Sequence, residues 1–306
     1  MTSILDEHGM GWLRDYPDAR DYTVAHTQVA PELRALGEKK SVKAMLAQVG
    51  VTKAAQGELP AEVDLRPWCS PIEDQGALGS CTAQAGVGLL EYYENRAFGQ
   101  YLDGSRLFLY KATRNLMGWT GDSGAFIRTT MGAMRLFGIP PEKHWPYTDG
   151  DKFDEEPPAF CYAYAHNYRA LSYYRLDPAG TGTAELLAQV RANLAGGLAM
   201  MFGFTVYSSI GQAKEQGRIP YPAPKESVMG GHAVVAVGYH DALTIHNTNV
   251  GGRETTGALL VRNSWGTQWG EEGYGWLPYE FVFKGLAVDW WSLLKNDWVD
   301  TGEFGL

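Results

Sequence analysis

Cysteine is scarce in this sequence, which has three of them, Cys69, Cys81 and Cys161, among 306 residues. Three cysteines are too few for a disulfide-stabilised scaffold, and their separation does not match the spacing of metal ligands in sequence motifs. We therefore expect no metal ion and no cofactor. The default compartment for such a chain is the reducing cytoplasm, with unconventional secretion left open.

Long hydrophobic runs are missing as well. No stretch approaches the ~20 apolar residues of a membrane-spanning helix, and the N-terminus lacks the basic start and apolar run of a secretion signal. Basic residues are outnumbered, since 26 Lys and Arg face 35 Asp and Glu and give a formal net charge of −9. These absences predict a soluble, leaderless protein whose partners include neither nucleic acid nor membrane.

The remaining composition is that of a globular protein, 45% hydrophobic and 20% charged. Such a chain can bury a large core in one or two domains. Residues 1–62 are first polar and turn-rich, then amphipathic, and end in a linker. We expect them to form a prosegment-like or lid segment, followed by a compact domain over residues 63–306.

Helical patterns come early in that domain and strand-like patterns late. Apolar spacing predicts helices from Cys81 to about residue 99, over 123–138 with Ser123 as N-cap and Gly138 as terminator, and over 183–194. From residue 198 onward, apolar runs alternate with turn-forming segments, as strands do. This order predicts an α+β fold with a mainly helical lobe at 63–172, a mainly β lobe with a C-terminal extension at 173–306, and a cleft between them.

The stretch DQGALGSCT, residues 74–82, places Cys81 in the first turn of a predicted helix. A lone cysteine is more often a small buried side chain than a nucleophile. The start of a helix, however, favours the nucleophilic thiolate, because unpaired N–H groups and the helix dipole stabilise negative charge there. Cys81 is therefore a candidate nucleophile, provided that a base lies nearby.

Two later stretches offer that base and its support. GGHAVVAVGY places His232 at the start of an apolar strand, and VRNSWGTQWGEEGYG places Asn263 at the end of another. An asparagine carbonyl oxygen can accept the proton of a histidine ring nitrogen and so fix the tautomer and orientation of the ring. The side chains of Trp265 and Trp269 are close enough in sequence to shield such a bond from water.

These three stretches, in this order, resemble the papain-like cysteine peptidases, in which His and Asn follow the nucleophile by roughly 130 to 150 residues. The flanking segments resemble a leaderless bacterial branch of that family. The resemblance implies a two-lobed papain-like fold with an antiparallel, β-barrel-like second lobe, and a cysteine-type endopeptidase that forms a thioacyl-enzyme at Cys81. It also implies His232 as general base and acid, Asn263 as the residue that orients it, and Gln75 in the oxyanion hole.

The same resemblance assigns substrate binding to one set of residues: Gly124, Ala125, Ile127, Ala233, Trp265 and Trp269. Ile127 and Ala233, with Met201, fall where the family builds an apolar pocket for the second residue before the scissile bond. Leu78 and Asp122 stand where the family has two bridged cysteines, so that this disulfide is missing here.

Several alternatives stay open at this level. An amine can capture the same thioacyl intermediate, which would make the protein a transpeptidase or ligase, and a catalytically silent binding module of the same fold is a third reading. Cys69 and Cys161 are either two buried thiols or a disulfide. Residues 1–60 are either a structural strap or an intramolecular cover of the cleft, in which a peptide or protein substrate would bind.

Overall fold

The computed structural model describes residues 8–24, 26–29, 34, 39–48, 51, 59–148 and 152–296. Its helices and strands are listed here by their bounds. The helices are α3 (Val42–Gln48), α5 (Cys81–Phe98), α6 (Arg106–Met117), α7 (Ile127–Leu136), α8 (Ala159–Ala165), α9 (Thr183–Ala195) and α10 (Tyr279–Phe283), with short 3₁₀ turns η1 (Arg66–Trp68), η2 (Glu142–His144) and η3 (Ser208–Ala213). The strands are β1 (Trp12–Leu13), β2 (Glu62–Asp64), β3 (Ala125–Phe126), β4 (Ala170–Arg175), β5 (Met200–Tyr207), β6 (Val228–His246), β7 (Glu254–Arg262), β8 (Tyr274–Pro278) and β9 (Ala287–Asn296).

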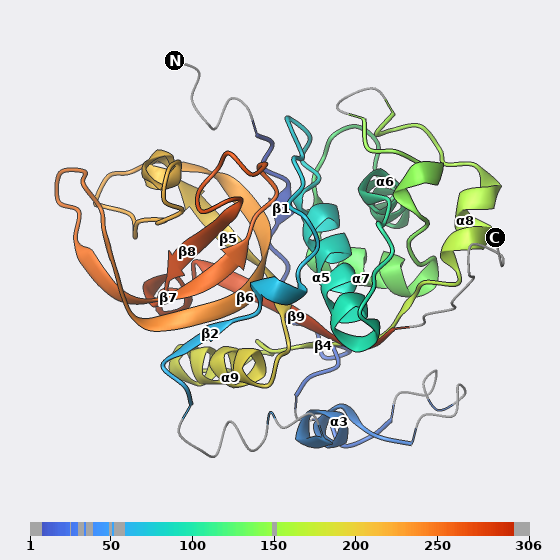
Figure 1. The fold of residues 1–306 in the computed structure, drawn as a ribbon, viewed down its shortest axis with the longest axis horizontal. Coiled ribbons are helices and arrows are strands. Elements are labelled where there is room, and N and C mark those ends of the chain that lie inside the picture. The colour runs from blue at the N-terminus through green and yellow to red at the C-terminus, as the bar shows by residue number, and fades with distance from the viewer. Residues whose placement is uncertain are drawn as a thin grey trace.

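A seven-stranded antiparallel sheet forms one side of the molecule, and α5, α6, α7 and α8 form the other (Figure 1). The strands follow the order β4-β9-β5-β6-β7-β8, with β2 paired to β6. Within the described residues this path stays open and does not close into a barrel. The predicted α+β, two-lobed papain-like fold is confirmed, with an open sheet in its β lobe.

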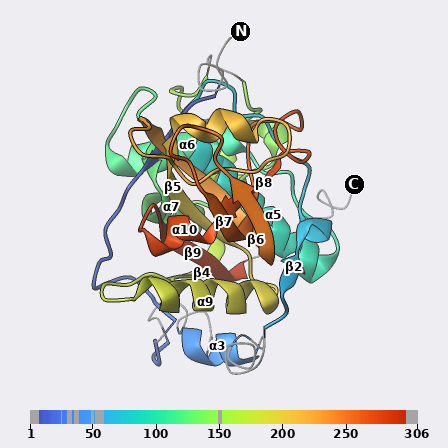
Figure 2. The ribbon, with the colours of Figure 1, turned by 90° about the vertical axis from the view of Figure 1, so that its left-hand side faces the viewer.

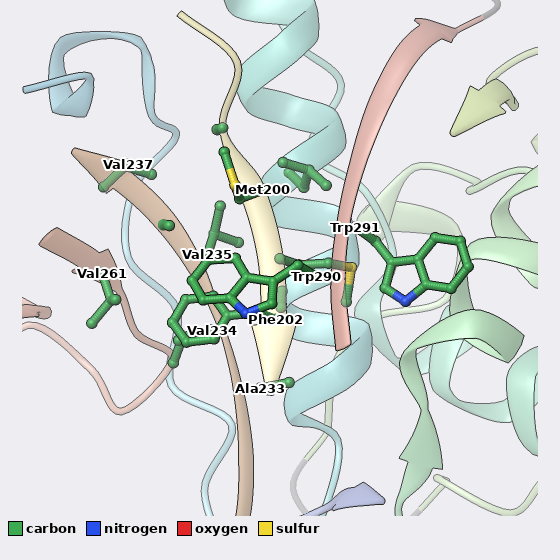
Figure 3. Packing of buried hydrophobic residues seen from close by; sticks show 14 of the residues in the cluster. Met200, Phe202, Ala233, Val234, Val235, Val237, Val261, Trp290 and Trp291 are labelled. Atoms are coloured by element: carbon green, nitrogen blue, oxygen red, sulfur yellow. The ribbon is translucent and has the colours of Figure 1, made fainter. Parts of the chain in front are cut away.

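Apolar side chains of β5, β6, β7 and β9 form the core of the β lobe (Figure 3). The rings of Phe202 and Trp290 stack with their centroids 3.9 Å apart, and Trp291 leaves β9 on the side opposite to Trp290. Alternation along a strand sends successive side chains to opposite faces, so β9 has an apolar side chain on each face of the sheet. Because apolar side chains are buried on both faces of β9, this strand lies in the interior of the lobe.

Helix α5 lies between the sheet and helices α6, α7 and α8 (Figure 1). All of its first twelve residues are buried, because both of its sides face protein. A Cβ atom at Gly88 would lie 2.4 Å from the Arg262 guanidinium at the end of β7, so the glycine allows this close approach. The helix ends at Gly99, which has the left-handed conformation with φ of 72°.

Helix α9 and helix α3 lie side by side at the end of the molecule away from the N-terminus, in both views (Figure 2). Helix α9 confirms the predicted helix at 183–194, and α3 covers the part of the amphipathic N-terminal pattern that is described. The remaining residues of that pattern, and most of the predicted linker, lie outside the described residues. None of the described helices is long and apolar enough to cross a lipid bilayer.

The predicted helix at 123–138 begins later than expected. Ala125 and Phe126 instead form β3, which pairs with β1, and α7 starts at Ile127. The proposed N-cap at Ser123 is therefore wrong, since its hydroxyl donates to the Gly124 carbonyl oxygen and caps no helix. The predicted end is confirmed, because Gly138 follows α7 with φ of +82°.

Cys69 and Cys161 are free thiols that pack in separate hydrophobic clusters. Cys69 follows the 3₁₀ turn η1, and its thiol donates to the Leu65 carbonyl oxygen at 3.7 Å. Cys161 lies within α8, and its thiol donates to the His144 carbonyl oxygen at the same distance. The structure therefore supports the reading as two thiols over the disulfide.

Candidate active site

Cys81 is the first residue of α5 and is fully buried. Burial raises the pKa of its thiol to about 11, because a thiolate without water around it is costly. Hydrogen bonding from the backbone of Ala233, Gly11 and Thr82 opposes this rise in part. Cys81 is therefore a neutral thiol in this conformation, and its surroundings include the residue that follows His232 and a residue from the N-terminus.

His232 lies within β6 and is also fully buried. Its Nε2 is 2.7 Å from Oδ1 of Asn263, which follows β7 and also accepts the Ser264 N–H at 2.8 Å. Because Oδ1 is the acceptor in both bonds, Nε2 carries the proton and Nδ1 has a free lone pair. In the described part of the chain, Nδ1 has no hydrogen-bond partner. Burial lowers the pKa of His232 to about 4, so the ring is neutral.

Gln75 is held in one orientation by two bonds. The Ser264 hydroxyl donates to Oε1 at 2.7 Å, which leaves Nε2 as the donor end of the amide. Nε2 donates to the Leu78 carbonyl oxygen at 2.8 Å and to the Gly9 carbonyl oxygen at 3.0 Å. A backbone carbonyl oxygen from the N-terminus therefore receives one N–H of the Gln75 amide.

Trp265 covers the histidine. Its ring centroid is 4.7 Å from that of His232, and the Trp269 ring meets it edge-on at 5.4 Å. Both indoles are 2% exposed, which keeps bulk water away from the bond between His232 and Asn263. Trp265 also lies close to His8, with 5.3 Å between the ring centroids.

Residues 9–12 pass directly along these side chains. The Gly11 carbonyl oxygen accepts the Ala125 N–H at 2.8 Å, and β1 continues as a parallel pair with β3. A Cβ atom at Gly11 would lie 1.7 Å from the Gly79 carbonyl oxygen, and one at Gly124, where φ is +70°, would lie 2.3 Å from the Gly11 carbonyl oxygen. Glycine at both positions allows two backbones to pass in contact beside Cys81.

Charged side chains hold the next part of the N-terminus on the body. Arg128 of α7 forms ion pairs with Asp15 and Asp21, and both oxygens of Asp21 accept from it at 2.8 Å. The buried Arg175 of β4 lies 3.5 Å from Asp21 as well. We call residues 8–24 the N-terminal segment; it is anchored at Arg128 and Arg175 and reaches the thiol through Gly11.

Comparisons with known proteins assign the chain to a family. The family model described as papain family cysteine protease matches residues 59–281. The chain belongs to the papain family of cysteine peptidases. It is 31% identical, over 95% of its length and 88% of the relative's, to an uncharacterised peptidase C1-like protein of Acanthamoeba polyphaga mimivirus. Chicken (Gallus gallus) cathepsin K is 30% identical over 70% of this chain and 58% of its own.

Among solved structures, xylellain, a cysteine protease from Xylella fastidiosa, superposes with a TM-score of 0.72 at 31% identity. The alignment covers 96% of this chain and 97% of xylellain. The likeness therefore extends beyond the matched domain to both flanks. It agrees with the bacterial branch of the family that the flanking segments indicate.

The structure brings together the side chains that the sequence picked out for this peptidase. Asn263 is hydrogen-bonded to His232, Ser264 links Asn263 to Gln75, and the Ala233 backbone contacts the Cys81 thiol. Ile127 is buried at the start of α7. Gly124 and Ala125 contact the N-terminal segment, and Trp265 and Trp269 stand beside His232.

Ser264 and Asp289 escaped the sequence reading, and Asp122 was noted there only as the residue that replaces a bridged cysteine of the family. Asp122 accepts the Gly79 N–H at 3.0 Å and the Tyr110 hydroxyl proton, where the family has a disulfide. Ser264 orients Gln75, and Asp289 of β9 contacts Trp12. The SW pair in VRNSWG offered a weak signal for Ser264, but no local pattern marks Asp289 as part of a site.

Proposed function

We propose that Cys81 is the nucleophile of a peptidase that cleaves peptide bonds through a thioacyl-enzyme. Nδ1 of His232 takes the thiol proton as Sγ attacks the substrate carbonyl carbon, and the negative charge passes to the carbonyl oxygen. The C–N bond then breaks, and His232 returns the proton to the leaving amine. Water, deprotonated by His232, attacks the thioester, which releases the acid and restores the thiol.

Three other side chains would support these steps. Asn263 holds the proton of Nε2, so that Nδ1 stays the accepting nitrogen. Gln75 Nε2 and the Cys81 backbone N–H, one of the unpaired N–H groups at the start of α5, would stabilise the oxyanion. The observation that supports this best is that Gln75 Nε2 already donates to a backbone carbonyl oxygen, that of Gly9. A peptide carbonyl is the group that an oxyanion donor must recognise.

We infer that the N-terminal segment, within the expected prosegment-like region 1–62, covers the substrate-binding site of the domain at 63–306. The Gly9 carbonyl oxygen accepts an N–H of Gln75, and the Gly11 carbonyl oxygen accepts the N–H of Ala125. The Gly11 backbone also contacts the Cys81 thiol. A substrate needs these same donors, so the segment and the substrate compete for them. The buried, neutral thiol and imidazole fit a covered state, because burial is the first cause of both pKa shifts.

Labelling with a thiol-directed epoxide peptide tests the nucleophile. Intact mass should show one adduct on the full chain, and no adduct on Cys81→Ala, although Cys69 and Cys161 remain. Cys69→Ala and Cys161→Ala serve as matched controls and should label like the original chain. An adduct of equal yield on Cys81→Ala would contradict the assignment.

Transfer to an amine is the competing outcome of the same thioester. Mass analysis of products with and without an added amine nucleophile separates the two activities. A hydrolase gives free acid in both, whereas a transpeptidase or ligase gives mainly the amide when the amine is present. The length of the products from an internally quenched protein substrate separates endopeptidase from exopeptidase cleavage.

A further inference from the structure

A cavity of about 540 Å³ opens on the β lobe, where β5 ends and β6 begins. Its lining comes from the end of β5, the loop before β6, the turn between β6 and β7, and the residue after α10, and includes Tyr207, Tyr221, Lys225, Arg253 and Lys284. All residues of the N-terminal segment are described, and none of them contributes to this lining. The segment therefore covers the proposed active site and leaves this cavity accessible. A cavity of this volume holds several groups of a ligand rather than one ion.

Three basic side chains line the cavity. Lys225, Arg253 and Lys284 are exposed, and within the residues that the structure describes none of them forms an ion pair. The Arg253 guanidinium instead lies over the Tyr221 ring, with 4.6 Å between its central carbon and the ring centroid. Since the chain as a whole has a formal net charge of −9, these side chains form a local cationic region on an acidic protein. Such a region attracts anionic groups within about 8 Å, the Debye length at physiological salt.

The loop that carries Lys225 is held in one conformation. Lys225 has φ of +72°, which is uncommon for a residue other than glycine. The buried Asn247 side chain donates to the Tyr221 carbonyl oxygen at 2.9 Å and to Oε1 of Glu226 at 2.8 Å. Asn249 donates to the same oxygen at 2.8 Å, so the one acidic residue of the lining already has hydrogen-bond donors. Left-handed residues that are held by their neighbours cluster at ligand-binding and active sites.

The cavity lies within reach of a substrate at the proposed active site. Phe204 of β5 pairs with His232, and Tyr207 pairs with Val228, which places Tyr207 about 10 Å beyond Phe204 along the strand. Between the cavity and His232, strand β6 has two exposed apolar side chains, Val228 (59%) and Met229 (42%). An extended polypeptide of about five residues spans about 17 Å. A substrate held beside His232 therefore reaches the cavity with residues about that many positions from its scissile bond.

From this arrangement we propose that the cavity binds an acidic stretch of a protein substrate, about five residues away from the scissile bond. Aspartate and glutamate side chains of that stretch pair with Lys225, Arg253 and Lys284, while apolar side chains next to it contact Val228 and Met229. A sulfated polysaccharide also carries negative charge, but it has no apolar side chains for this contact. Because single exposed ion pairs contribute little, the three cations act together, and their effect falls on substrate affinity.

The proposal rests on the proposed function, because it names the substrate class of that site, and its test has one arm that needs no catalysis. Fluorescein-labelled hexaglutamate and hexaglutamine peptides are titrated into the full chain carrying Cys81→Ala, and binding is followed by fluorescence anisotropy. We expect hexaglutamate to bind about ten-fold more tightly or better at low salt, and the ratio to approach one in 0.5 M sodium chloride. Equal binding of the two peptides at low salt, or binding of neither, overturns the proposal.

Two double variants show whether the cavity is responsible. Arg253→Gln with Lys284→Gln removes two cations of the lining, and the affinity ratio should fall below about three-fold. Arg20→Gln with Lys43→Gln is the matched control, because it changes the net charge equally at two exposed residues that do not line the cavity, and it should keep the ratio. Equal losses in both double variants overturn the proposal. A labelled heparin fragment is the third probe; if it binds through the same cations while hexaglutamate does not, the cavity takes a sulfated sugar and the proposal is wrong.

The catalytic arm uses the full chain with Cys81 intact. Internally quenched peptides share one cleavable centre and carry five glutamates or five glutamines, beginning about five residues before or after the scissile bond. We expect glutamate at one of these places to lower KM severalfold with little change in kcat, and Arg253→Gln with Lys284→Gln to abolish the difference. Turnover of all peptides with equal KM overturns the proposal. Charge-selective binding without turnover of any peptide supports the cavity and contradicts only the proposed function.

Discussion

The carbonyl oxygen of Gly9 accepts a hydrogen bond from Gln75 Nε2 at 3.0 Å, although the two residues are separated by 66 positions in the chain. In this position the N-terminal backbone occupies the donor that we assign to the oxyanion. Two residues further on, Gly11 contacts the Cys81 thiol. The N-terminal segment and the body therefore meet at the atoms proposed for the chemistry, and each of these contacts can be tested by substitution.

Substitution of each proposed catalytic residue should lower the turnover rate by a different amount. We expect Cys81→Ala to abolish turnover and His232→Ala to come close to that, since a thiol without its base stays protonated at neutral pH. Asn263→Ala should keep measurable activity, because Asn263 orients the base and forms no bond to the substrate. Steady-state kinetics on a fluorogenic peptide checks all three, and substantial turnover by Cys81→Ala would rule out the mechanism.

Loss of the amide donor should act on the chemical step. Gln75→Ala is expected to lower kcat by roughly 10- to 1000-fold with little change in KM, which is the range for removal of one oxyanion donor. Ser264→Ala is the companion variant, because it keeps the Gln75 amide but removes the hydroxyl that fixes its orientation. It should also lower kcat, by less than Gln75→Ala does. An unchanged kcat in Gln75→Ala would remove this residue from the site.

Trp12→Ala should activate the full chain. It removes the indole from its pocket and the bond to Asp289, and so weakens the hold of the N-terminal segment on the site. We expect kcat/KM on a small peptide to rise severalfold, together with faster labelling of Cys81. Tyr16→Ala is the matched control, since Tyr16 is an aromatic residue of the same segment with 71% exposure. Equal rates for both variants and the original chain would favour a structural strap over a cover.

The stability of the folded chain should fall in mild acid because of His232. Its pKa is lowered to about 4, below the ordinary value of 6.5, so the unfolded chain binds this proton first as the pH falls. The folded state thus loses stability between about pH 6.5 and pH 4, by about 3 kcal/mol at most if the unfolded pKa is the ordinary one. Thermal unfolding of the original chain and of His232→Gln across this range checks it. The difference in Tm between them should change with pH, and a constant difference would contradict the shift.

Removal of the Asp122 carboxylate should loosen the turn before Cys81. Asp122→Ala leaves the Gly79 N–H and the Tyr110 hydroxyl without their acceptor, at a cost of about 1–3 kcal/mol in the free energy of unfolding. We also expect lower kcat, since Gly79 is two residues from Cys81. Urea unfolding and kinetics measure both effects. Ser123→Ala, which loses a weaker bond next door, should have little effect, and equal losses in the two variants would speak against a special role for Asp122.

The sequence predicted the parts of the site that lie within local patterns. Cys81 at the start of a helix and Asn263 at the end of a strand follow from apolar periodicity and turn residues, and the structure has both. His232 lies further inside its strand than expected, because β6 begins at Val228 and continues to His246. Helix α6 was missed, although Ser105 accepts the Phe108 N–H as an N-cap and Gly118 ends the helix, which are readable signals.

The rest of the site depends on contacts between distant segments. The pairing of β1 with β3 moved the start of α7 from Ser123 to Ile127, and no property of residues 123–127 alone indicates a partner at Trp12. Asp289 lies 277 positions from Trp12, and its direction results from a bulge between two strands. Tertiary pairing of this kind overrides local preference and is invisible in single-sequence periodicity.

The Asp122 carboxylate has a practical consequence for a thiol enzyme. As the proposed nucleophile, Cys81 must be kept reduced, and a reductant strong enough for that also attacks any disulfide that braces the loops around it. Here the brace between the Cys81 turn and the 121–125 loop consists of hydrogen bonds from Gly79 and Tyr110 to one carboxylate. The reagent that protects the thiol therefore leaves its supporting loops intact, and unfolding midpoints measured with and without dithiothreitol should coincide.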